Sequence, residues 1–316
     1  MRPFLITLTV FFINCLITAQ DSLYDYLPKN ISYNPEITSP KAFFGHEPGE
    51  WHLSHDKLYY YMLELAKQSD RTVWEEYGKS YENRPLGHLI ISSPQNIRNL
   101  EKIRQQNLLL CDPEQSGDLD ISKMPIVIKL GYGIHGNESS SQNASVLTAY
   151  YLTAGSGDQI DNLLSNAIIL IDPSLNPDGL QRHSSWVNAQ RSLRNNPDAN
   201  SWEFSEPWPG GRGNHYWFDL NRDYLLLQHP ESIGRVAAYF RWRPVIITDH
   251  HEMGADRTFF FQPGIPTRNN PLVPVENYQF TAEIASYHEK YLNEINSLYY
   301  SEEDFDDFYI GKGSSF

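Results

Sequence analysis

The sequence predicts an α/β fold, because short apolar strands alternate with helices from residue 125 onward. The runs "PIVIKL" (125–130), "AIILID" (167–172) and "PVIITD" (244–249) lack the alternation of a half-exposed strand. Helical stretches lie between them. Strands of this kind, separated by helices, are typical of a sheet that helices cover on both faces.

The elements before this region fit the same class. In "SHDKLYYYMLELAKQSD" (54–70), apolar residues recur at helical spacing after a Ser/His/Asp start. "TVWEEYGKS" (72–80) and "LGHLIISS" (86–93) are predicted strands, and "ENRP" between them is a predicted turn.

Four helices are expected in the second half: "SSQNASVLTAYYLT" (140–153), "DQIDNLLSN" (158–166), "HPESIGRVAAYFRW" (229–242) and most of "VENYQFTAEIASYHEKYLNEINSLYY" (275–300). Pro230 suits the first turn of the third. Loop sequence is expected after "AIILID".

The N-terminus predicts export. Arg2 precedes an apolar stretch that ends in the small-residue "ITA", which is the pattern of a secretory signal peptide over residues 1–19. The alternative is a membrane anchor, but the apolar run is short for a span. We therefore expect a periplasmic or extracellular protein with no stable membrane insertion after cleavage. A Pro/Asn/Gly-rich, extended lead-in (20–50) and one domain (51–316) follow.

Bulk composition excludes some classes of function. The 316 residues are 40% hydrophobic and 13% aromatic, which suits a globular core. The formal net charge is −14 and there is no Lys/Arg-rich run, so nucleic acid is not an expected partner. After signal cleavage Cys111 alone remains, which rules out an internal disulfide.

The glycine-rich stretch "GYGIHGNESS" (131–140) follows the first apolar strand and carries His135 and Glu138. Imidazole and carboxylate are both zinc ligands, and a spacing of three at a loop-to-helix junction lets both face one point. The alternative is a solvated turn. A catalytic zinc also takes a third protein ligand.

The segment "TDHHEMG" (248–254) offers that third ligand at the end of another strand. Strand alternation places Asp249 and His251 on one side and His250 on the other. We therefore favour His251 over His250 as the ligand. Glu252 is either a surface charge or a partner of a ligand.

A third segment, "GGRGNHYWFDLNRDY" (210–224), carries Arg212, Asn221 and Arg222. A guanidinium beside an amide can hold a carboxylate, and a second guanidinium can polarise a carbonyl. Asp219 could orient a ligand histidine. The alternative is a loop with ordinary surface arginines. Together the three segments indicate zinc, an activated water and a pocket for an anionic chain terminus.

In order and spacing, these motifs resemble the zinc metallocarboxypeptidases of the carboxypeptidase A/B and N/E type. "HGNE" matches their His-x-x-Glu metal pair, and "NPDG" (176–179) matches a signature of the N/E branch. "GRGNHYWFDLNR" and "DHHEMG" are similar to the substrate-binding and third-ligand segments. The resemblance spans about residues 50 to 316. It implies an α/β/α sandwich with a mixed, mostly parallel eight-stranded sheet.

The resemblance also implies residue roles. His135, Glu138 and His251 would hold one Zn²⁺ per chain, and Asp219 would support His135.

On the substrate side, Arg212 would polarise the scissile carbonyl and stabilise the oxyanion. Asn221 and Arg222 would bind the terminal carboxylate of a peptide or protein. Tyr309 is a weaker match to the tyrosine that closes over the substrate.

The resemblance has one departure. The family's general-base glutamate is expected shortly after Tyr309, and this chain ends at Phe316 without it. We therefore expect a domain that is incomplete at its C-terminus, lacks its last strands and hydrolyses poorly.

The predicted function is a zinc-dependent metallocarboxypeptidase that cleaves C-terminal peptide bonds with a zinc-activated water. The alternatives are a zinc amidase or deacylase acting on peptidoglycan-like or acyl-amino-acid substrates, and a non-catalytic, zinc-containing peptide-binding module.

Overall fold

The structure, a computed structural model, describes residues 26–301 except 195, 199, 254–257, 265–266 and 268–269. The predicted signal peptide (1–19) and Tyr309 lie outside the described residues.

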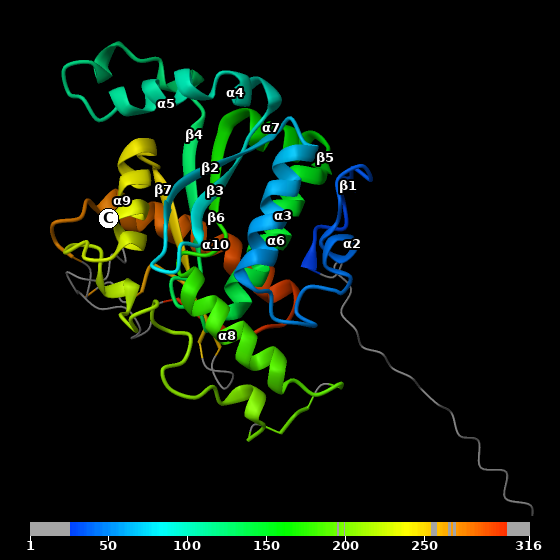
Figure 1. Cartoon of the computed structure of the whole chain (residues 1–316). Helices are drawn as coiled ribbons and strands as arrows, with labels where there is room; N and C mark the ends of the chain where they lie inside the picture. Colours follow the sequence, from blue (N-terminus) through cyan, green and yellow to red (C-terminus); the bar gives the residue numbers. More distant parts are fainter. Residues whose placement is uncertain are drawn as a thin grey trace, which may run out of the picture.

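A mixed five-stranded sheet forms the centre of the described chain (Figure 1). Its spatial order is β2 (Thr72–Lys79), β3 (Pro85–Ile91), β6 (Ala167–Asp172), β4 (Ile126–Tyr132) and β7 (Ile246–His250). β3 runs antiparallel to both of its neighbours, whereas β6, β4 and β7 are parallel. The predicted α/β class and mixed sheet are confirmed.

The expected number of strands differs from the structure. Among the described residues the central sheet has five strands rather than eight, and β8 (Phe259–Phe260) pairs with β9 (Tyr299–Tyr300) in a separate two-stranded sheet. The expectation of a mostly parallel sheet was wrong for these strands, since two of the four pairings are antiparallel.

Helices cover both faces of the sheet at β6, as its unalternating sequence predicted. The run "PVIITD" also lacks alternation, but exposure alternates along β7 and Ile247 is 52% exposed, because β7 is the edge strand of the described sheet. In β6, Ile169 and Ile171 belong to a core shared with α3 (His55–Gln68), α6 (Ser139–Ala154) and α7 (Asp158–Asn166). Ile168 and Leu170 point the other way, to α5 (Leu100–Leu109) and α9 (Pro230–Trp242). Each side chain of this kind, when fully buried, stabilises the fold by about 1.5–3 kcal/mol. The sheet is therefore the middle layer of a sandwich.

The lead-in segment packs on this sandwich. Its described part contains β1 (Ser32–Tyr33) and α2 (Pro40–Phe44), and Leu27 and Ile37 are buried in the α3/α6 core. β1 pairs with β5 (Gly155–Ser156), directly after α6.

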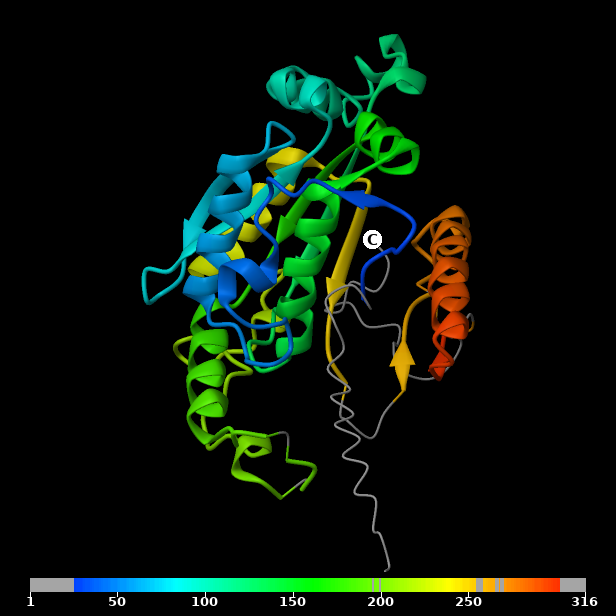
Figure 2. The same ribbon diagram turned by 90° about the vertical axis from the view of Figure 1, so that its right-hand side faces the viewer.

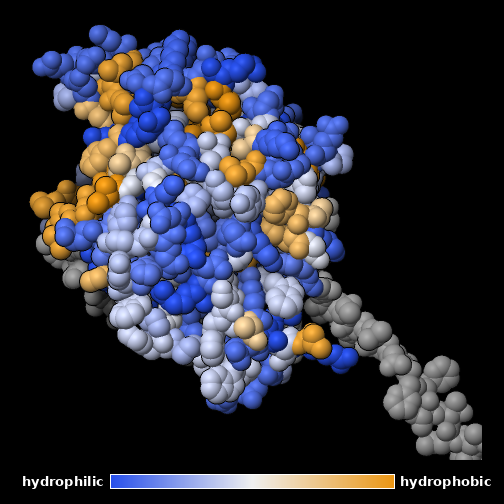
Figure 3. Space-filling model, viewed as in Figure 1, coloured by the Kyte–Doolittle hydropathy of each residue, from blue (hydrophilic) through white to orange (hydrophobic). Residues whose placement is uncertain are grey.

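At the other end of the chain, α10 (Val275–Glu294) stands to one side of the sandwich (Figure 2). No helix in the described part of the chain has the length and apolarity to span a membrane. The face in Figure 3 is mainly hydrophilic, with separate apolar patches, and the mean hydropathy of the chain is −0.50.

The prediction of loop sequence after "AIILID" was wrong, because the helix α8 (Pro177–Gln190) begins within a few residues. "NPDG" resembles a turn, yet it starts this helix: the Asn176 side chain accepts the Gly179 N–H at 3.0 Å, and Pro177 occupies the first turn. Both are ordinary helix-start signals. The short helix α4 (Pro94–Arg98) and α5 were not predicted either.

The carboxyl ends of β6, β4 and β7 meet at one edge of the sheet. Gly131 in β4 is aligned with Asp172 in β6 and with Asp249 in β7. Segments that leave these strands therefore start side by side, at the edge where sites gather in α/β sheets.

A line of four ionisable side chains, three of them buried, crosses four neighbouring strands near this edge. The Lys129 ammonium lies 2.8 Å from the Asp172 carboxylate, with their side chains 6% and 0% exposed. His88 lies 3.3 Å from Asp172 on one side and 3.3 Å from Glu75 on the other. Burial alone would raise the pKa of Asp172, but the charges of Lys129 and His88 lower it.

Lys129→Met should destabilise the fold by about 3–5 kcal/mol, because it leaves the Asp172 carboxylate buried without its cation. Chemical denaturation at neutral pH measures this. The exposed pair Lys123–Asp120 is the control, and Lys123→Met should leave the free energy of unfolding nearly unchanged.

The same ion pair sets a dependence on pH. Because the folded-state pKa of Asp172 is lowered, its stabilisation is present above the ordinary carboxyl pKa and is lost as the pH falls through the folded value. The Lys129→Met penalty should therefore shrink in acid, and a penalty that grew there would contradict this account.

Candidate metal centre

The "HGNE" loop joins the end of β4 to the start of α6. Gly133 has a φ of +64°, and a Cβ at this position would overlap the side-chain amide of Gln142. That amide donates to the backbone carbonyl of His135 at 3.3 Å. Glu138 is the cap residue directly before α6. The loop thus presents His135 from a strand end and Glu138 from a helix start.

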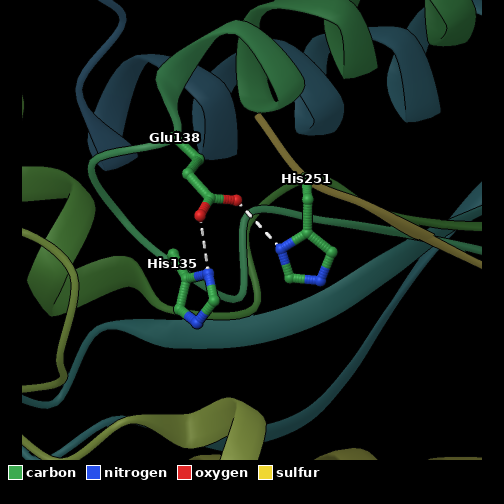
Figure 4. Close-up of side chains that lie close together, drawn as sticks. All are labelled: His135, Glu138 and His251. Atoms are coloured by element: carbon green, nitrogen blue, oxygen red, sulfur yellow. Dashed lines mark hydrogen bonds and ion pairs between the residues drawn. The ribbon is translucent and has the colours of Figure 1, made fainter. Parts of the chain in front are cut away.

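The structure brings His135, Glu138 and His251 together (Figure 4). The Nδ1 atom of His135 lies 2.8 Å from one Glu138 carboxylate oxygen, and Nδ1 of His251 lies 2.9 Å from the other. One potential ligand atom from each residue falls within 4.8 Å of the others. Two imidazoles and a carboxylate fit a catalytic zinc, which takes three protein ligands and keeps a fourth position open.

A carboxylate lies at the Nε2 atom of each imidazole, on the other side of the ring from Glu138. Asp219 lies 3.0 Å from Nε2 of His135, and Asp249 lies 3.0 Å from Nε2 of His251. An acceptor at Nε2 holds the proton there and leaves the Nδ1 lone pair free for a metal. A role for Asp219 beside a histidine was predicted. Asp249 was not assigned one, although its spacing of two from His251 on a strand was the available signal.

The neighbouring His250 points away from the cluster. Its ring stacks on Tyr132 with centroids 4.1 Å apart, and its Nδ1 lies 3.0 Å from the carbonyl of Gly131. Glu252 accepts the Ser140 N–H at 2.9 Å, near the start of α6, and donates its own N–H to Glu138. The segment after β7 is therefore tied to the segment before α6.

The electrostatics of the cluster favour a cation. Burial would raise the pKa of Glu138, but hydrogen bonds and charge from His135 and His251 lower it to about 2. Burial would lower the pKa of His251, but Asp249 and Glu138 raise it to about 10. The pKa of His135 is also raised, against burial, by Asp219 and Glu138. Carboxylates that hold protons on imidazoles in this way also attract a metal ion, which displaces the protons.

The predicted substrate-binding residues lie at different distances from the metal cluster. The Arg212 guanidinium donates to Asp219 at 3.0 Å and lies 3.4 Å from Nδ1 of His135. The Asn221 side-chain nitrogen lies 3.5 Å from Nε2 of His251. Arg222 is exposed, and its guanidinium donates to the backbone carbonyl of Asn221 at 2.9 Å. Arg212 and Asn221 thus adjoin the cluster, and Arg222 lies beside Asn221.

The backbone around Arg212 is held from α8 by a residue that sequence reasoning missed. Arg182 donates to three carbonyls that flank Arg212, those of Gly210, Gly213 and Asn214. Glu206 accepts the Gly211 N–H at 2.9 Å. A Cβ at Gly179 would overlap the Gly211 carbonyl, so "NPDG" allows close contact between α8 and the Arg212 segment.

We expect purified protein to carry about one zinc per chain, and His135→Ala or His251→Ala to remove it. His250→Ala is the matched control. It loses a ring stack, so it should lower stability while zinc stays bound. Metal analysis by mass spectrometry measures the ratio, and zinc retained by the His251 variant would overturn the choice of ligand.

Asp219→Asn and Asp249→Asn should each weaken zinc binding about 10- to 100-fold, because the ligand imidazole loses its charged acceptor. Competition with a chelator measures the affinity. Asp223→Asn, in the same segment as Asp219, is the control: Asp223 accepts backbone N–H groups of Gln228 and His229, so its loss should lower the thermal midpoint and spare the affinity.

The family model for zinc carboxypeptidases matches residues 58–242, more than half of the chain. The match includes His135, Glu138, Arg212 and Asp219 and ends before His251. No curated protein sequence matches the chain at a significant level.

Solved structures of carboxypeptidases share the fold. Thrombin-activatable fibrinolysis inhibitor is 15% identical to this chain with a TM-score of 0.54, and the matched region covers 87% of this chain and 63% of the inhibitor. Carboxypeptidase A from Helicoverpa armigera is 20% identical with a TM-score of 0.50, covering 79% and 57%. A metallo-carboxypeptidase from Burkholderia cenocepacia is 15% identical with a TM-score of 0.51, covering 79% and 53%.

The chain thus spans less than two thirds of the length of each of these three proteins. At these identities the likeness concerns the fold, and the family assignment rests on the family match. The chain belongs to the zinc carboxypeptidase family.

Proposed function

We propose that the chain carries the centre of a zinc-dependent metallocarboxypeptidase that hydrolyses C-terminal peptide bonds. The observation that supports this most directly is the cluster of His135, Glu138 and His251 with Arg212 beside it. A metal site alone is compatible with a structural ion. A guanidinium beside the cluster adds a donor of the kind that stabilises the oxyanion in acyl transfer.

The metal-binding residues have separable tasks. When bound, zinc supplies Lewis-acid chemistry, in that it lowers the pKa of a water and polarises a carbonyl. His135, Glu138 and His251 would hold it, with Asp219 and Asp249 fixing the two imidazoles.

The substrate would be oriented by the residues beside the cluster. Asn221 and Arg222 would bind the terminal carboxylate, because an amide and a guanidinium together match its two oxygens. Arg212 would donate to the scissile carbonyl as negative charge develops on its oxygen. Its bond to Asp219 aims the guanidinium before substrate arrives. We further propose that this site works outside the cytoplasm, which the signal-like sequence of residues 1–19 supports.

Starting from the weak hydrolysis expected of a chain without the general-base glutamate, Arg212→Gln should lower kcat about 10²- to 10³-fold further, because one donor to the developing oxyanion is lost. Asn221→Ala and Arg222→Ala should act mainly through KM. Arg241→Gln is the control, because Arg241 is as exposed as Arg212 but pairs with Glu75 on α9's side of the sheet. Release of the C-terminal residue from a short peptide by the zinc-loaded protein provides the assay.

Amidation of the peptide's C-terminus separates carboxypeptidase from amidase or deacylase action. A carboxypeptidase should bind and cleave the amidated peptide far less well than the free acid, since Asn221 and Arg222 lose their carboxylate. Equal use of both forms, insensitive to Asn221→Ala, would exclude the proposed function.

A further inference from the structure

A tight aromatic loop, residues 214–218, lies between Arg212 and Asp219. The Asn214 N–H donates to the Phe218 carbonyl at 2.9 Å, and the Trp217 N–H donates to the Asn214 carbonyl at 3.0 Å. The Asn214 side chain is fully buried and accepts further N–H groups of the loop. Since Arg212 also bonds Asp219, the loop is closed at its base beside the metal cluster.

Two large indole rings project from this region. Trp208 is 77% exposed and Trp217 is 56% exposed, and their ring centroids are 4.6 Å apart at an interplanar angle of 58°. We call these two residues the tryptophan pair. Single exposed aromatics are common on protein surfaces, but two in contact beside a site are not explained by packing of the core.

The backbone at Trp217 has a strained conformation. Trp217 has a φ of +68°, in the left-handed region that bulky residues rarely occupy. A Cβ at Gly213 would lie 2.5 Å from the Trp217 carbonyl carbon, so Gly213 permits this conformation. Strain of this kind concentrates at functional sites.

Tyr216 and Phe218 are as exposed as Trp217, at 55% and 57%, but the rings of the loop other than that of Trp217 contact the neighbouring protein surface. The Tyr216 ring meets Tyr81 edge to face, with centroids 4.8 Å apart, and His215 lies 3.0 Å from Glu82. These contacts dock one side of the loop on the β2–β3 turn. Arg182 and Glu206 hold the chain between Trp208 and the loop. The main chain next to both tryptophans is therefore held near Arg212, while both residues stay largely exposed.

The order of the strands indicates which part of a substrate meets the pair. His251 follows β7, His135 follows β4, and α8 follows β6, the strand on the far side of β4. Asn221 lies at His251, whereas Arg212 lies at His135 and its segment packs on α8. A peptide with its carboxylate at Asn221 and its scissile carbonyl at Arg212 thus continues toward the β6 side, where the tryptophan pair is carried.

We propose that Trp208 and Trp217 form a subsite for a large apolar or aromatic side chain on the amino-terminal side of the scissile bond. This proposal rests on the proposed function for the direction of the peptide. Indole rings offer a large, rigid contact area at low cost in conformational entropy, which suits a side chain that arrives from solvent.

Calorimetric titration of the zinc-loaded protein with four ketomethylene peptide isosteres, which cannot be hydrolysed, tests the subsite. The four combine a free or amidated C-terminus with either Phe or Ser directly before the isosteric bond. The native chain should prefer Phe over Ser, and Trp208→Ala or Trp217→Ala should reduce that preference by about two- to tenfold. Affinity for the Ser peptide should hardly change.

Trp202→Ala is the matched control, because Trp202 is 69% exposed but contacts Trp186 instead, and it should keep the native preference. Trp208→Phe and Trp217→Phe should restore part of the preference, which loss of folding would not allow. Equal binding of Phe and Ser peptides by the native chain, or a preference unchanged in both alanine variants, overturns the subsite.

The two proposals fail in different ways. A Phe preference that depends on the pair, with free and amidated peptides bound alike, supports the subsite and removes the carboxylate-binding role from Asn221 and Arg222. Discrimination between free and amidated peptides without any Phe preference supports the proposed function and overturns the subsite.

Discussion

The site depends on one carboxylate that faces two histidines from different strands. Glu138 directs one oxygen to His135, three residues before it, and the other to His251, more than a hundred residues later. This contact is possible only because β4 and β7 are adjacent and parallel and end at the same level. The sheet therefore sets the relative position of the segments that carry the three residues, and the loops hold the side chains in that arrangement.

The carboxylates in and around the metal cluster are compensated by cationic groups beside them. The carboxylates of Glu138, Asp219 and Asp249 are offset by the imidazoles of His135 and His251 together with the guanidinium of Arg212. The region is therefore polar at the edge of an apolar sandwich. Below it, Lys129 and Asp172 place a further pair of charges between the strands. A buried pair of this kind is weak evidence for added stability. It does make the alignment of β4 with β6 costly to change, and that alignment places "NPDG" beside "HGNE".

Much of this was predictable where a residue's role is local. The strand 167–172 and the helix 158–166 have the bounds that periodicity predicted, and alternation after Asp249 turned His251 rather than His250 toward Glu138. The residues and elements that were not predicted either depend on tertiary contacts or have a sequence that suits two structures. Arg182 bonds carbonyls about thirty residues away, which no local pattern reveals. Start signals of α8 were present, but Pro and Gly in "NPDG" equally suit a turn.

The glycines of these motifs connect the fold to the chemistry. Gly136 and Gly179 lie where a Cβ would overlap neighbouring backbone, so the "HGNE" loop, α8 and the Arg212 segment touch through their main chains. Backbone contact is stiffer than contact between long side chains, because no rotamers intervene. These contacts restrain the main chain on both sides of Arg212 against α8. A substrate that contacts Arg212 and the tryptophan pair would meet a surface already arranged, and little of its binding energy would be needed to order the loop.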